Sequence, residues 1–236
     1  MRILAIDTAT ESCSAALLLD ERVLQRQQLL ERGAADLILP MVAELLTEAD
    51  VRLAMLDAIA FGRGPGAFTG VRLAASVTQG LAFGARLKVV PVSDLEALAQ
   101  RALDDARAIE RVLVCTDARM NEVYWGCFER RADGLARTWG EERVTRPDEV
   151  TIPEPWRAAS EAVPGRLVGV GSGFTAYPRL RDELGLDRVL EGLFPRAIEV
   201  ARLAVREVAA GRILSAEQAL PVYLRDDVAR GPPGTS

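Results

Sequence analysis

The chain has 236 residues, 49% of them apolar, which suits one large α/β domain or two small ones with a substantial core. The formal net charge is −5, and the 29 basic residues are scattered among 34 acidic ones, which disfavours autonomous nucleic-acid binding. The sequence contains no histidine, which excludes Ser-His and Cys-His nucleophile pairs and removes the commonest metal ligand. No stretch reaches the ~18 unbroken apolar residues of a membrane span. We therefore expect a cytoplasmic protein with no membrane partner and no metal.

Strand and helix patterns alternate through the first hundred residues. Apolar runs predict strands at 2–7, 13–19, 22–30, 56–61 and 88–92, and helical periodicity predicts helices at 34–49, 68–85 and 93–106. Pro40 lies inside the first helical pattern, so this helix is expected to start or to kink there. These elements are typical of one α/β module.

The pattern restarts after residue 110. A strand at 111–117 ends in Asp117, as the first strand ends in Asp7, and 122–129 follows as its hairpin partner. This recurrence indicates a duplicated α/β unit. We expect a first lobe over 1–106, a second over 107–230 and a disordered tail over 231–236.

The second half is predicted to be less regular. Residues 131–165 contain many charges and prolines, so little regular structure is expected there. After them the pattern predicts a strand near 167–170, a helix near 174–184 and an amphipathic helix at 198–210.

Segment 62–72, GRGPGAFTGVR, places four glycines and a proline between a predicted strand and a predicted helix. Glycine lets a backbone or a ligand approach closely, and a helix N-terminus presents free amides that suit an anion. The residues that could form a vestigial anion or nucleotide site are Asp7, Gly64, Gly66, Thr69 and Gly70. The alternative, which these residues favour, is a tight turn beside a hairpin-stabilising aspartate. The segment matches neither the Walker A pattern nor G-x-G-x-x-G.

Four segments, at 1–11, 62–72, 117–125 and 221–225, resemble the bacterial TsaB (YeaZ) family and occur in the same order. The resemblance runs along nearly the whole chain. It implies an α/β fold of two tandem RNase H-like lobes of the actin/Hsp70/sugar-kinase type, in agreement with the duplication. It also implies a role in forming N6-threonylcarbamoyladenosine beside the anticodon of tRNA.

Within that pathway the resemblance implies a non-catalytic subunit without a cofactor of its own. A separate enzyme makes threonylcarbamoyl-adenylate, the paralogue TsaD transfers the threonylcarbamoyl group, and the ATPase TsaE supports turnover. This chain is expected to form a heterodimer with TsaD, or a homodimer when alone, and to meet ATP, ADP or tRNA only through the complex. TsaD-like proteins bind a metal through an H-x-x-x-H motif that residues 32–40 lack. A metalloprotease activity is therefore not expected.

The sequence departs from its relatives at two positions. Many of them carry a histidine near position 34 and a serine at position 67, where this chain has Ala34 and Ala67. One hydroxyl group that could bind an anion is therefore missing, although Thr69 keeps another.

TsaD is expected to dock on helices 34–49 and 71–85, whose small and apolar residues could form an exposed patch for a partner. The residues expected at this interface are Leu37, Met41, Val42, Leu45, Val71, Ala74, Ala75 and Thr78. An aspartate at Val42, Leu45 or Ala75 should then break the complex and leave the fold intact.

Two other functions stay open. An ATP-using small-molecule kinase of the same fold would use Asp7 and Asp117 as metal-linked carboxylates, although the lobes leave little room for a substrate domain. A module that binds tRNA directly is disfavoured by the negative net charge.

Overall fold

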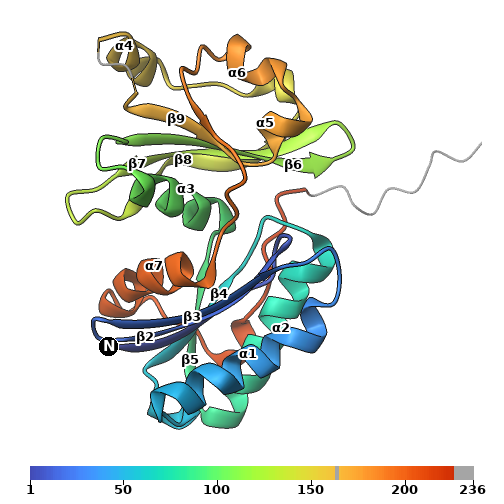
Figure 1. Cartoon of the computed structure of the whole chain (residues 1–236), viewed down its shortest axis with the longest axis vertical. Helices are drawn as coiled ribbons and strands as arrows, with labels where there is room; N and C mark the ends of the chain where they lie inside the picture. Colours follow the sequence, from blue (N-terminus) through green and yellow to red (C-terminus); the bar gives the residue numbers. More distant parts are fainter. Residues whose placement is uncertain (163–164, 226–236) are drawn as a thin grey trace, which may run out of the picture.

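The computed structural model describes residues 1–162 and 165–225, and it contains two five-stranded mixed sheets (Figure 1). The strand order is β3-β2-β1-β4-β5 in the first sheet and β10-β9-β6-β7-β8 in the second. The central strand β1 pairs antiparallel with β2 and parallel with β4, and β6 pairs in the same way with β7 and β9. This repeated topology confirms the predicted duplication.

The elements follow in chain order. The first half contains β1 (Arg2–Asp7), β2 (Ser12–Leu19), β3 (Arg22–Leu29), α1 (Ala34–Ala49), η1 (Leu53–Met55), β4 (Ala58–Gly62), α2 (Phe68–Ala85), β5 (Lys88–Val92) and α3 (Asp94–Asp105). The second half contains β6 (Arg111–Arg119), β7 (Glu122–Arg130), β8 (Ala136–Thr145), η2 (Pro147–Glu149), α4 (Glu154–Ala162), β9 (Leu167–Val170), α5 (Gly173–Ala176), α6 (Arg179–Glu183), β10 (Val189–Leu190), α7 (Ala197–Ala209) and η3 (Ala216–Gln218).

Three predictions about these elements need correction. The stretch 131–165 is not irregular, because it contains β8 and α4. The single helix expected near 174–184 is divided into α5 and α6, with Pro178 as the N-cap of α6. Helix α1 begins at Ala34 and continues through Pro40, so it does not start at the proline. The predicted disordered tail lies outside the described residues.

Helices and sheets alternate in layers. In Figure 1, α1 and α2 cover the outer face of the first sheet, α7 and α3 lie between the sheets, and α4, α5 and α6 cover the second. Strand β1 is buried on both faces: Ile3 and Ala5 belong to the cluster between the sheets, and Leu4 and Ile6 to the cluster under α1 and α2. This alternation follows from the two-residue period of a strand.

Two helices lie on the lobe opposite to the one that chain order assigns to them. Helix α3 contacts β6, β7 and β8 of the second sheet, and α7 contacts β1, β2, β4 and β5 of the first. The predicted boundary between residues 106 and 107 is therefore wrong for these helices. Each apolar inner face needs a helical cover, and the other half of the chain supplies it.

The described helices are those of a layered α/β protein. Within residues 1–162 and 165–225, none combines the length and the apolar character needed to cross a membrane.

Candidate functional site

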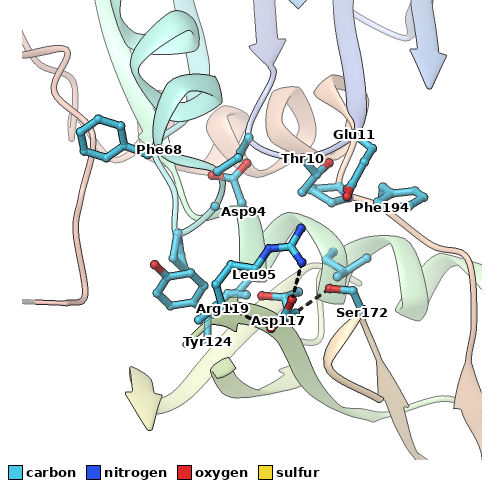
Figure 2. A pocket seen from close by; sticks show the side chains of 18 of the residues that line it. Thr10, Glu11, Phe68, Asp94, Leu95, Asp117, Arg119, Tyr124, Ser172 and Phe194 are labelled. Atoms are coloured by element: carbon cyan, nitrogen blue, oxygen red, sulfur yellow. Dashed lines mark hydrogen bonds and ion pairs between the residues drawn. The ribbon is translucent and has the colours of Figure 1, made fainter. Parts of the chain in front are cut away.

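A cavity of about 850 Å³ lies between the two lobes (Figure 2). Thr10, Glu11 and the turn at 65–68 line it from the first lobe, and 116–119 and Ser172 line it from the second. Its lining also includes the start of α3 and the chain end at Tyr223 and Arg225. The cavity is therefore the place where a nucleotide could lie between the two lobes.

The predicted anion site is not assembled in this cavity. Gly66 lines the cavity, whereas Asp7, Gly64, Thr69 and Gly70 are not part of its lining. Asp7 is fully buried, while the Thr69 side chain is exposed at the start of α2.

The glycine turn packs against the turn between β1 and β2. Ala67 N donates a hydrogen bond to Ala9 O at 2.8 Å, and Thr8 Oγ1 donates to Gly70 O at 2.7 Å. A Cβ atom at Gly66 would lie only 2.5 Å from Ala9 O, and one at Gly70 would collide with Thr8 O. The glycines are therefore required for close backbone packing, as the tight-turn alternative predicts.

A phosphate at the start of this turn would need the backbone amide there as a hydrogen-bond donor, but this amide already donates to a carboxyl group. Gly64 N donates a hydrogen bond to Asp94 Oδ2, and Asp94 is buried. A phosphate placed there would have no free amide at Gly64 and would lie beside the acidic side chain of Asp94. This geometry argues against an anion site at Gly64.

Asp7, at the end of β1, and Asp117, near the end of β6, form the same local turn. Asp7 Oδ1 accepts a hydrogen bond from Ala9 N at 2.9 Å, and Asp117 Oδ1 accepts one from Arg119 N at 3.0 Å. Figure 2 shows that Asp117 also forms an ion pair with Arg119, while its N–H donates to Ser172 Oγ at 3.0 Å. Both side chains therefore stabilise hairpin turns. Among the described residues, no group of three or more Cys, Asp or Glu side chains is placed to bind a metal ion.

The comparison with known proteins assigns the family. The sequence profile "TsaD: tRNA N6-adenosine threonylcarbamoyltransferase" matches residues 23–176. The "tRNA threonylcarbamoyladenosine biosynthesis protein TsaB" of Escherichia coli (strain K12) is 44% identical over 230 residues, which cover 97% of this chain and 96% of that protein. The chain belongs to the TsaB (YeaZ) family.

Other members of the family are similar to this chain over nearly its whole length. The TsaB protein of Haemophilus influenzae is 39% identical over 234 residues, covering 97% of this chain and 95% of that protein. The solved structure of YeaZ from Pseudomonas aeruginosa has a TM-score of 0.85 and 45% identity, and covers 94% of this chain and 99% of that chain. The predicted α/β fold of two tandem lobes is thus confirmed.

The residues predicted to contact TsaD prove to be core residues of this TsaB-family chain. Leu37 is half-buried against the cluster between the first sheet and its outer helices. The other seven are at most 8% exposed, and they are Met41, Val42, Leu45, Val71, Ala74, Ala75 and Thr78. An aspartate at Val42, Leu45 or Ala75 would therefore disrupt the fold as well as any complex, so the mutational test predicted above is wrong.

The solvent-facing sides of α1 and α2 carry a different set of residues. Apart from the neighbouring stripe of Asp36, Pro40, Glu44 and Glu48 on α1, we define the outer helix face as the exposed, mostly small or apolar residues that recur about every four positions along each helix. They are Ala35, Leu39 and Ala43 on α1, and Phe68, Arg72, Ser76, Gly80, Phe83 and Gly84 on α2. Helical periodicity located an apolar stripe correctly but did not distinguish the stripe that faces the sheet from the stripe that faces solvent.

The end of the described chain, residues 221–225, forms a strap between the lobes. Val222 N donates a hydrogen bond to Arg63 O at 2.7 Å in the first lobe. Arg225 forms an ion pair with Glu122 and donates to Ala118 O at 3.2 Å in the second lobe. Sequence analysis marked this segment only as part of the family resemblance, because its partners are far away in sequence.

Tyr223 of the strap completes a stacked cluster at one edge of the cavity. Its Oη accepts a hydrogen bond from Arg72 Nε at 2.7 Å. The Arg72 guanidinium carbon lies 3.5 Å from the centre of the Phe68 ring, and the two aromatic rings are 6.1 Å apart. This cluster ties the strap to the first turn of α2.

Proposed function

We propose that this chain is a subunit without a catalytic site of its own, acting with TsaD and TsaE in forming N6-threonylcarbamoyladenosine in tRNA. The names of its relatives support the pathway. The match to the TsaD profile includes α1 and α2, which supports a partner of related fold that could pair equivalent helices with these two. The outer helix face is the observation that carries the proposal.

The outer helix face has the composition of a docking surface. Phe83 is 69% exposed and Leu39 is 49% exposed. Burying one such side chain fully contributes about 1.5–3 kcal/mol. Ser76, Gly80 and Gly84 follow one another on α2 without bulky side chains, so a partner helix could approach closely. In the absence of TsaD, the same face could pair with a second copy of this chain.

The interior of the cleft supports a non-catalytic role. The amide groups of Gly64 and Ala67 already donate to groups within the chain, and histidine is missing from the sequence. A phosphoryl-transfer site needs donors and metal ligands that face the substrate. The cleft is therefore better suited to holding the two lobes together than to chemistry.

Binding of the purified chain to TsaD tests the outer helix face. Leu39→Asp and Phe83→Asp should each weaken the complex at least tenfold in calorimetry, because a charge would replace a buried anchor. Leu29→Asp is the matched control, since Leu29 is 60% exposed on the edge strand β3. Unchanged affinity in both helix variants would refute this surface. A reconstituted tRNA modification reaction without this chain should lose most of its product.

Calorimetry with ATP and Mg²⁺ separates this proposal from the kinase-like alternative. The isolated chain should give no saturable heat, because Gly64 N and Ala67 N already donate within the chain and the buried Asp7 is not part of the cavity lining. Tight binding accompanied by ATP turnover would support an ATP-using enzyme instead.

A further inference from the structure

Two buried carboxyl groups meet where the lobes join. Asp7 ends β1 in the first lobe, and Asp94 is the first residue of α3, which packs on the sheet of the second lobe. Their exposed fractions are 0% and 2%. The pair therefore connects an element of one lobe to an element of the other.

The hydrogen bonds of this pair leave one oxygen on each side chain unsatisfied. Asp7 Oδ1 accepts from Ala9 N, and Asp94 Oδ2 accepts from Gly64 N. Asp7 Oδ2 and Asp94 Oδ1 are buried without a hydrogen-bond partner among the described residues. Unsatisfied buried oxygens are costly, and two adjacent carboxylates repel each other. One proton between the side chains removes both costs.

Gly62 at the end of β4 shows how tightly the two carboxyl groups are packed. A Cβ atom at this position would collide with Asp94 Oδ1 and would lie 3.1 Å from Asp7 Oδ1. The site therefore has no room for a larger side chain beside the two acids.

We propose that Asp7 and Asp94 share one proton, and that this shared proton is a latch that holds the start of α3 against the first lobe. Its loss places two negative charges side by side and releases the start of α3. Asp94, Leu95 and Leu98 all line the cavity, so the latch also sets the width of the cavity.

Other charged groups around the pair raise or lower the pKa values of the two carboxyl groups. Glu199 of α7 adds to the burial that raises the pKa of Asp7 to about 6, and Glu199 is itself paired with Arg196. Burial and the charge of Asp7 raise the pKa of Asp94 well above its ordinary value, and Arg63 opposes them. Arg63 in turn pairs with Glu142 at 3.2 Å. Burial and the mutual repulsion of the two acids therefore both favour a proton on the pair.

The second crossing between the lobes lies close to the latch. Ala197 N, at the start of α7, donates a hydrogen bond to Ser14 Oγ of β2 at 2.9 Å. Ser14 is paired with Asp7 across the β1–β2 ladder. The crossings at α3 and α7 therefore pass the same point, and loosening α3 there allows the lobes to rotate.

Distances between spin labels on the two lobes test the latch. Ala54→Cys in η1 and Glu183→Cys in α6 place labels at exposed positions in opposite lobes. Cys13, Cys115 and Cys127 are buried and burial raises the pKa of each thiol, so they resist labelling at pH 7. Between pH 7 and pH 10 the distance distribution of the otherwise unchanged chain should broaden or shift.

Asp94→Asn is the informative variant, because an amide still accepts from Gly64 N and can donate to Asp7 but cannot lose a proton in this range. Its distance distribution should not respond to pH. Asp117→Asn, the equivalent aspartate of the second lobe, should respond like the unchanged chain. An unchanged distribution up to pH 10 in the chain with both acids, or an equal response in Asp94→Asn, would overturn the latch.

Carboxyl carbon chemical shifts give a second measurement that needs no variant at the pair. One carboxyl group of the pair should keep the shift of a protonated acid at pH 7. If both carboxyl groups have the shifts of ionised groups at pH 7, the latch is refuted.

Discussion

The ends of β1 and β6 compare the same turn in two environments. β1 ends in Asp7, and β6 carries Asp117 two residues before its last residue. In each case Oδ1 accepts a hydrogen bond from the amide two residues later. In the first lobe, the glycine turn and the start of α3 seal Asp7 from solvent. In the second lobe, Asp117 faces the cavity and pairs with Arg119. The local sequence sets the turn, while the surrounding packing decides whether the carboxyl group is sealed inside the protein or meets the cavity.

Glycine is essential in the first lobe, where the turn seals Asp7 from solvent. A Cβ atom at Gly70 would collide with Thr8 O, so Gly70→Ala should lower the free energy of unfolding by about 2–4 kcal/mol. Gly84 in the same helix has open space around it, and Gly84→Ala should stabilise the chain by about 0.5–1 kcal/mol. Urea unfolding of both variants measures the difference, and equal effects would show that the seal is not tight.

The sealed acids should make stability depend on pH. A carboxyl group whose pKa is higher in the folded chain stabilises the fold below its unfolded pKa, near 4, and this stabilisation is lost as pH rises through the folded pKa. The pKa of Asp7 is raised to about 6 and that of Asp94 well above its ordinary value. Asp94→Asn should therefore be more stable than the unchanged chain at pH 8, by about 1–3 kcal/mol, with a smaller difference at pH 5.

Thermal unfolding of both chains between pH 5 and pH 9 measures this difference. Acids with a lowered pKa, such as Glu207, have the opposite pH dependence. They are present in both chains, and their contribution cancels in the comparison. If Asp94→Asn were less stable than the unchanged chain at pH 8, the raised pKa values of the buried acids would not explain the pH dependence.

The second lobe, where Asp117 faces the cavity, should tolerate loss of the charge on this side chain. Asp117→Asn keeps an acceptor for Arg119 N and loses a partly exposed ion pair, so unfolding free energy should change by less than about 1 kcal/mol. A loss as large as that of Gly70→Ala would show that the two turns are equally sealed.

The strap should contribute least to stability. Arg72→Ala removes the stacking on Phe68 and the hydrogen bond to Tyr223 Oη at an exposed position, a loss of about 0.5–1 kcal/mol. Hydrogen exchange at Val222 N should quicken in this variant more than exchange in the central strands. Unchanged exchange at Val222 would show that Arg72 does not hold the strap.

Several elements were predictable because their signals are local. Helices α1 and α2 have the predicted ends, because each continuous helical pattern lies between turn or strand residues. The glycines at 66 and 70 were correctly assigned to a tight turn. Strand β8 escaped prediction because it lies at a sheet edge, where most of its side chains meet solvent. Its mixture of charges therefore resembles that of a loop.

By itself the sequence determined the duplicated α/β pattern, the family, and the chemistry that a chain without histidine lacks, since these depend on residue type and spacing along the chain. Only the tertiary structure decided which side of α1 and α2 faces solvent. It also decided that α3 and α7 cross to the opposite lobes, and that Asp7 lies beside Asp94. Burial and pairing between distant segments depend on how whole layers pack, and packing sets whether a carboxyl group meets water or another acid.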